Sequence, residues 1–101
     1  MTNDFPTIMA QELTDPDVST SRMFGTACLK VEGKVYAMEF KGALVVKLSK
    51  SRAAELVSGG MAQVFDPGHG RPMKQWVAIF PDAGLDWGRL AAEAKSVVRT
   101  T

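Results

Sequence analysis

The sequence has little of what builds a disulfide framework or a metal site, with one cysteine and one histidine among 101 residues. A single cysteine cannot form an intramolecular disulfide, which fits a reducing compartment such as the cytosol. The N-terminal segment lacks the basic and apolar parts of a signal peptide. The purest apolar run, residues 43–46, is far too short to span a bilayer. We therefore expect a cytoplasmic protein.

An excess of either charge is also missing, because 12 Lys and Arg balance 11 Asp and Glu to a net charge of +1. Neither sign forms a run, which argues against a strong electrostatic footprint for nucleic acid or an anionic membrane. The hydrophobic fraction of 46% is ordinary for a globular chain, and this length allows one modest core. We expect a single domain over residues 1–101.

Catalytic constellations are absent as well. His69 could serve as a base or a metal ligand, but no nucleophile, orienting partner or carboxylate cluster accompanies it. The glycines of "GHGRP" and "EGK" lack the spacing of phosphate-binding loops, and turn chemistry explains them. We interpret His69 as a loop histidine and expect no catalytic residues, cofactor or metal.

The hydrophobic periodicity indicates the secondary structure. A 3.6-residue period predicts a first helix over residues 5–13, followed by a polar connecting loop over residues 17–21. A period of two then predicts three strands within residues 26–48, broken at "EGK" and "KG". A short helix begins at Ser49 or Ser51 and ends at Gly59 and Gly60. Strands follow over 61–65 and 73–80, and Asp86 caps a final helix over 86–99.

The predicted order is therefore α-β-β-β-α-β-β-α. Strand meanders without βαβ crossovers indicate an α+β domain with an antiparallel sheet and helices packed on it. The loop over residues 66–72, with two prolines and two glycines, forbids regular structure.

Apolar residues on both faces of the strands suggest an interface. Alternation places Tyr36, Met38 and Phe40 on one face and Val35 and Ala37 on the other. The strand over 73–80 is apolar on both sides, so it is either sandwiched within the protein or presents a face to a partner. Because short helices cover one side only, we expect an apolar sheet face, with Trp76 near its centre, to form a homodimer.

Basic residues on the strands suggest an alternative. Lysines on one polar sheet face, together with Trp76, could form a nucleic-acid surface of the stacking kind. These lysines are Lys30, Lys34, Lys41, Lys47 and Lys74. The competing interpretation is that they keep the strands soluble and block edge pairing. Trp87 opens the apolar stripe of the final helix and is expected in the core.

A family resemblance adds to these patterns. The segments "RMFG", "ACLKV", "GKVYAM", "LVVKL", "RPMKQWVAI" and "DWGRLAAEA" resemble the N-terminal domain of the TfoX/Sxy competence-regulator family, over residues 22–98. The resemblance implies an α+β unit with an antiparallel sheet and no agreed catalytic residues. Larger family members carry a second, C-terminal domain.

The "RMFG" motif has a structural interpretation. Met23 and Phe24 would anchor the entry to the first strand in the core, Gly25 would permit a close backbone approach, and Arg22 would stay at the surface. Gly33 and Trp87 complete this structural set.

We therefore predict a non-enzymatic, TfoX-like domain that acts through protein contact or self-association. The alternative is a nucleic-acid-associated regulator that uses the basic sheet residues. The candidate partner-binding residues are Arg22, Lys34, Lys47, Lys74 and Trp76.

Overall fold

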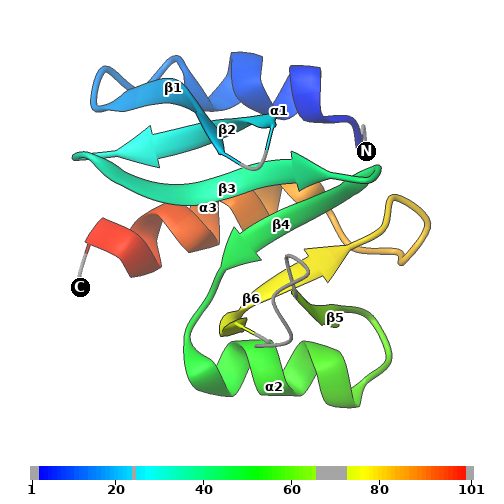
Figure 1. Ribbon diagram of the computed structural model, residues 1–101. Coiled ribbons are helices and arrows are strands. Elements are labelled where there is room, and N and C mark those ends of the chain that lie inside the picture. Colours follow the sequence, from blue (N-terminus) through cyan, green and yellow to red (C-terminus); the bar gives the residue numbers. More distant parts are fainter. Residues whose placement is uncertain (1–2, 24, 66–72, 100–101) are drawn as a thin grey trace.

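The computed structural model describes residues 3–23, 25–65 and 73–99, and in it one six-stranded antiparallel sheet carries three helices (Figure 1). The sheet order is β1-β2-β3-β4-β6-β5, and every neighbouring pair of strands is antiparallel. The predicted α+β class is confirmed, with one strand more than expected. The elements are α1 (Phe5–Glu12), β1 (Val18–Met23), β2 (Thr26–Val31), β3 (Lys34–Phe40), β4 (Ala43–Lys47), α2 (Lys50–Ser58), β5 (Gln63–Phe65), β6 (Met73–Ile79) and α3 (Trp87–Arg99).

The additional strand is β1, where the prediction of a loop over residues 17–21 is wrong. It pairs with β2 from Val18 opposite Val31 to Met23 opposite Thr26. Residues 19–22 are exposed, because β1 is an edge strand held by its backbone bonds to β2. A strand of this kind needs no apolar alternation, so the period-two pattern does not reveal it.

Two tight turns connect β2, β3 and β4 into a meander. Glu32 and Gly33 both have positive φ, 51° and 81°, and Lys41 and Gly42 repeat this at 51° and 82°. Positive φ at both central residues is the type I′ turn, whose twist matches the right-handed twist of the flanking strands. The "EG" and "KG" pairs therefore place β2, β3 and β4 side by side, which supports the structural role expected of Gly33.

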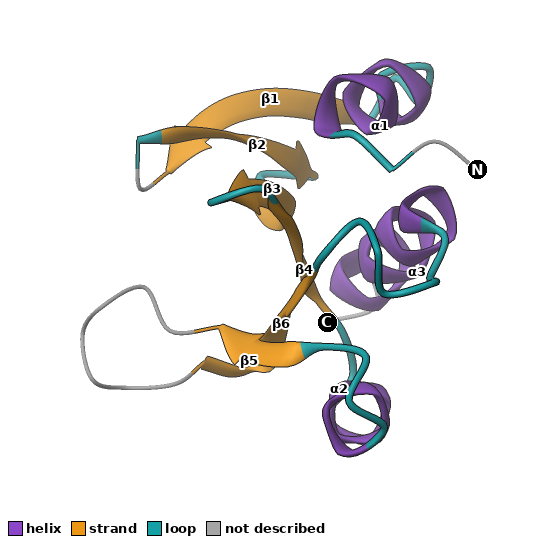
Figure 2. Ribbon diagram, turned by 90° about the vertical axis from the view of Figure 1, so that its right-hand side faces the viewer, coloured by secondary structure: helices purple, strands orange, loops and turns teal. Residues whose placement is uncertain are grey.

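All three helices lie on the same side of the sheet (Figure 2). Ser49 caps α2, its side chain accepting from the Arg52 N–H at 3.2 Å. Asp86 precedes α3 and accepts from the Gly88 N–H at 3.0 Å, as a capping residue does. The main core lies between these helices and the sheet, and Trp87, 1% exposed, is part of it as predicted. We call this side of the sheet the helix face.

A bulge in β3 changes the predicted faces. Leu29 pairs with Ala37, but Lys30 pairs with Val35, so Tyr36 is an extra residue on β3. Tyr36 and Ala37 both belong to the helix-face core, whereas Met38 lies on the opposite side. The prediction that Tyr36 shares a face with Met38 and Phe40 is therefore wrong, because strict alternation does not allow for the bulge.

The opposite side of the sheet, which we call the open face, carries a second apolar cluster. Its buried members are Cys28, Met38, Val45 and Phe65, and its partly buried members are Val35, Phe40, Trp76 and Ala78. The helices therefore cover one side only, as expected, but the centre of the other side is still removed from solvent within the chain.

Candidate functional site

The open face is built by the register of the central strands. Val45 of β4 lies opposite Met38 of β3 and Ala78 of β6. Two residues further along β4, Lys47 lies opposite Trp76. Side chains directly opposite in an antiparallel pair share a face and contact each other. Lys47 and Trp76, both partly exposed, therefore form a neighbouring cation and aromatic beside the buried centre.

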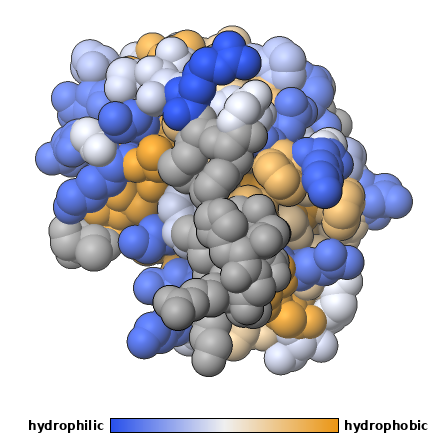
Figure 3. All heavy atoms as spheres, viewed as in Figure 1, coloured by the Kyte–Doolittle hydropathy of each residue, from blue (hydrophilic) through white to orange (hydrophobic). Residues whose placement is uncertain are grey.

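A second aromatic pair lies on the same face. The rings of Phe40 and Phe65 meet edge to face, with centroids 5.2 Å apart and planes at 81°. Lys41 Nζ lies 5.4 Å from the centroid of the Phe40 ring, within the range of a cation–π contact. Figure 3 views this side of the sheet and shows hydrophobic side chains gathered in patches between hydrophilic ones. The open face thus combines aromatic and aliphatic surface with lysines.

The charges are segregated, although their sum is close to zero. The strands carry the basic residues Arg22, Lys30, Lys34, Lys47 and Lys74. Glu39 is their single acidic residue, and it pairs with Leu44, a residue of the helix-face core. Lys30 pairs with Val35 and Lys47 with Trp76, which places both lysines on the open face. No acidic residue lies on the open face in the strand segments that the structure describes.

The structure brings only part of the predicted site together. Lys47 and Trp76 are neighbours, but Lys34 pairs with Val31 of the helix-face core and so lies on the other side of the sheet. Arg22 is exposed on β1, opposite Ala27, which packs against the helix-face core. The prediction of one basic sheet face is therefore wrong for Lys34, because its pairing with Val31 directs it away from Trp76. Arg22, a separate partner-binding candidate, lies on that same side.

Several other predicted residues lie outside the described part of the chain. These are Phe24 and His69, together with the side chains of Met23 and Lys74. Gly25 is described, and its φ of +75° fits the turn between β1 and β2.

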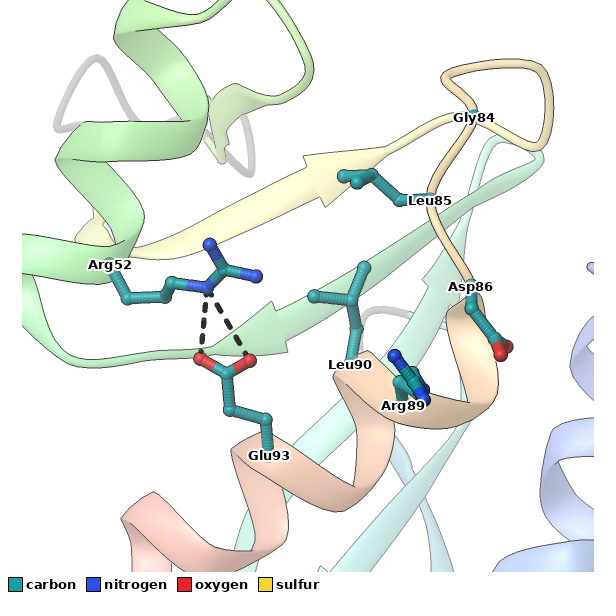
Figure 4. Close-up of a pocket in the computed structure, with 7 residues that line it drawn as sticks. All are labelled: Arg52, Gly84, Leu85, Asp86, Arg89, Leu90 and Glu93. Carbon is teal, nitrogen blue, oxygen red and sulfur yellow. Dashed lines mark hydrogen bonds and ion pairs between the residues drawn. The ribbon is translucent and has the colours of Figure 1, made fainter.

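A hollow between α2, α3 and the segment before α3 has a volume of about 420 Å³ (Figure 4). Arg52 reaches across it to Glu93, with Nε 3.1 Å from Oε2, and also pairs with Glu55 at 2.7 Å. The residues that line the hollow are Arg52, Gly84, Leu85, Asp86, Arg89, Leu90 and Glu93. Two basic and two acidic side chains cancel there, so the hollow favours no charged ligand. In the described segments, no group of three His, Cys, Asp or Glu residues could hold a metal ion.

A buried polar network joins α1, β3 and α3 on the helix face. Glu12 is 4% exposed, and its Oε1 accepts from the Tyr36 hydroxyl at 2.8 Å and lies 3.5 Å from Lys95 Nζ. Lys95 also contacts Asp15 at 3.2 Å, and Arg99 contacts Asp15 at 3.0 Å. The apolar patterns of the sequence do not predict this network. Its signal is the spacing of Phe5, Ile8 and Glu12, which places a carboxylate on the apolar stripe of α1.

Burial and hydrogen bonds shift the acidity of these groups. Desolvation, followed by the bond to Glu12, raises the pKa of Tyr36 well above its ordinary value. The Asp17 N–H, which donates to Asp15 Oδ1 at 2.9 Å, lowers the pKa of Asp15, and Lys95 and Arg99 act in the same direction. On the open face, burial raises the pKa of the Cys28 thiol. The network therefore keeps Tyr36 neutral and Asp15 charged, as a structural tie requires.

No family model, curated protein or solved structure matches this chain. The resemblance to the TfoX/Sxy family therefore stays a prediction from the sequence. No helix among the described residues is long and apolar enough to cross a membrane.

Proposed function

We propose that this chain is a non-enzymatic binding domain of the TfoX/Sxy N-terminal type, which contacts a partner protein through its open face. The observation that carries the proposal is the one-sided helix layer. On the side that the helices do not cover, Val35, Phe40 and Trp76 remain partly exposed around a buried apolar centre. Contiguous apolar surface of this kind marks interaction sites, and tryptophan is enriched among the residues that dominate binding energy.

The charges of the open face specify the partner. Lys30 and Lys47 lie on it without an acidic neighbour in the described strands, and Lys41 stands over Phe40. A protein that brings apolar side chains together with Asp or Glu would satisfy both features. Two open faces packed about a two-fold axis would instead bring the same lysines toward one another. The open face is therefore better suited to a different, acidic protein than to its own copy.

The test is capture of partners from the native lysate with matched charge variants. Lys47→Glu removes the cation beside Trp76, whereas the control Lys50→Glu makes the same change at an exposed position of α2. We expect Trp76→Ala and Lys47→Glu each to reduce capture of a nuclease-resistant partner at least tenfold, the scale of an aromatic or charged hot spot. Equal capture by all four proteins would contradict the proposal.

A second candidate function is binding of single-stranded nucleic acid, favoured by the pairing of Lys47 with Trp76. Proteins that bind single-stranded nucleic acid combine an aromatic ring, on which a base stacks, with a cation that contacts the phosphate. Here captured material would disappear after nuclease treatment. Binding of a labelled oligonucleotide would weaken steeply with salt, and Lys47→Glu would reduce that salt dependence.

A further inference from the structure

We propose that the free edge of β1 pairs with β1 of a second copy of this chain, in antiparallel register, so that one sheet runs through both copies. This surface is separate from the open face, and the inference does not rest on the proposed function. It concerns the edge of the sheet and its unpaired backbone groups.

The edge at β1 lacks most of the features that usually block strand addition. β1 is the terminal strand of the sheet, six residues long, and the opposite edge strand β5 has only three residues. Its sequence, "VSTSRM", contains no proline, lysine or acidic residue, and Arg22 is its one charged side chain. Its register with β2 is unbroken, whereas the β2–β3 and β5–β6 pairs each contain a shift. Natural edge strands are normally protected by such residues, by bulges or by short length. No strand lies beyond β1 in the sheet that the described segments form.

The hydrogen-bond pattern identifies which β1 groups point outward. The Glu32 N–H donates to the Asp17 carbonyl at 3.5 Å, so this directly opposite pair is a hydrogen-bonded one. Hydrogen-bonded and non-hydrogen-bonded pairs alternate along an antiparallel ladder, so Thr20 and Arg22 belong to non-hydrogen-bonded pairs with β2. Their N–H and C=O groups therefore point away from β2. Val18 belongs to the same set, but its N–H already donates to the Asp15 carbonyl at 3.1 Å. Thr20 and Arg22 therefore offer two complete outward sites.

A two-fold pairing uses both sites at once. Thr20 of one copy pairs with Arg22 of the partner subunit, and the reverse pair follows by symmetry, so each pair exchanges both backbone bonds. Ser21 then lies opposite Ser21 of the partner subunit at the axis. No two arginines face each other, because each lies opposite a threonine. Directly opposite residues share a face of the sheet, so the helices of both copies lie on the same side.

An exposed leucine at this end of the molecule supports the second copy as the occupant. Leu13, 43% exposed, follows α1, which lies beside β1 on the helix side (Figure 2). With both helix layers on the same side, pairing of the β1 edges brings the two α1 helices toward each other. The dimer therefore covers apolar surface as well as backbone groups, which an extended peptide alone would not do.

Disulfide trapping tests the register. In a Cys28→Ala background, Ser21→Cys places two thiols at a non-hydrogen-bonded pair, where Cα atoms lie about 4.5 Å apart, within disulfide range. The background is needed because Cys28 lies opposite Ser21 on β2 and would capture the new thiol. Ser19→Cys is the control, since Ser19 shares the face of Ser21 but would lie opposite Met23 of the partner subunit. We expect a covalent dimer from Ser21→Cys at least tenfold faster than from Ser19→Cys.

Sedimentation tests the association without a crosslink. Thr20→Pro removes an outward N–H that β2 does not use, and Thr20→Ala is the control that keeps it. We expect concentration-dependent dimers for wild type and Thr20→Ala, and at least tenfold weaker association for Thr20→Pro, with far-UV circular dichroism unchanged. Trp76→Ala should leave this association intact, which separates it from the open face.

Two outcomes would overturn the inference. One is a wild type that stays monomeric up to millimolar concentration while Ser21→Cys and Ser19→Cys crosslink equally slowly. The other is a monomeric wild type whose capture of a different protein is lost in Thr20→Pro, which would assign the edge to a foreign strand.

Discussion

The two faces of the sheet are both apolar, but they differ in what covers them. The helix face is covered by three helices, and its core also holds the Tyr36–Glu12–Lys95 network. The open face has a smaller buried centre with an aromatic and aliphatic rim that stays partly exposed. An apolar strand face therefore does not by itself indicate what covers it. Where helices supply the cover, the strand face becomes core; on the open face only the centre is buried and the rim stays partly exposed.

The largest expected effect comes from breaking the polar network of the helix face. Glu12→Ala leaves the Tyr36 hydroxyl without its acceptor and Lys95 without one of its carboxylates. Because Glu12 is buried, we expect a loss of about 3 kcal/mol in the free energy of unfolding. Tyr36→Phe should cost only about 1 kcal/mol. Urea unfolding of both single variants and the double variant measures the coupling, and strictly additive losses would show that the contact is not energetically significant.

Two neighbouring valines of β4 compare the faces directly. Val45 and Val46 are both 0% exposed, the first on the open face and the second on the helix face. We expect Val45→Ala and Val46→Ala each to cost about 2 kcal/mol, and Val35→Ala, at the partly exposed rim, less than about 1 kcal/mol. Chemical denaturation measures all three. A cost near zero for Val45→Ala would mean that the open face is not packed in the free chain.

The single tyrosine of the chain reports on the network through its ionisation. Burial and the bond to Glu12 raise the pKa of Tyr36, so the folded protein binds this proton more tightly than the unfolded chain. The resulting stability is present below the ordinary tyrosine pKa, about 10, and is lost as the pH rises above it. We expect tyrosinate absorbance to appear together with loss of circular dichroism in an alkaline titration. Ionisation in the folded state near the ordinary pKa would contradict the buried contact.

A smaller effect is expected at low pH. The Asp17 N–H lowers the pKa of Asp15, so the folded protein binds this proton less tightly than the unfolded chain. The stability from Asp15 is present above the ordinary aspartate pKa, about 3.9, and is lost as the pH falls through the lowered value. Urea midpoints between about pH 5 and pH 2 should therefore fall less for Asp15→Asn than for wild type. Parallel pH profiles would show that Asp15 is not linked to folding.

The class of fold and most helix and strand positions could be predicted, because period-two and 3.6-residue patterns report local burial. β1 could not be predicted, because residues 19–22 are exposed at the edge of the sheet and their polar side chains show no apolar alternation. The face on which Tyr36 lies depends on the β3 bulge. The bulge shifts the strand pairing but does not change the apolar pattern of the sequence. On the open face, the structure places the candidates Lys47 and Trp76 opposite each other, and their role in binding stays a prediction. The sequence does not show that Lys34 lies on the other side of the sheet, because the spacing of the lysines does not indicate which face each one occupies.

The position of α3 in the chain has a consequence for synthesis on the ribosome. α3 packs on β2, β3 and β4, yet it follows all six strands in sequence. During translation the helix side of the meander therefore leaves the exit tunnel before the helix that covers it. Until α3 emerges, Leu44 and Val46 lack that cover and Glu12 lacks Lys95. The nascent domain thus exposes residues of its helix-face core to solvent for part of its synthesis.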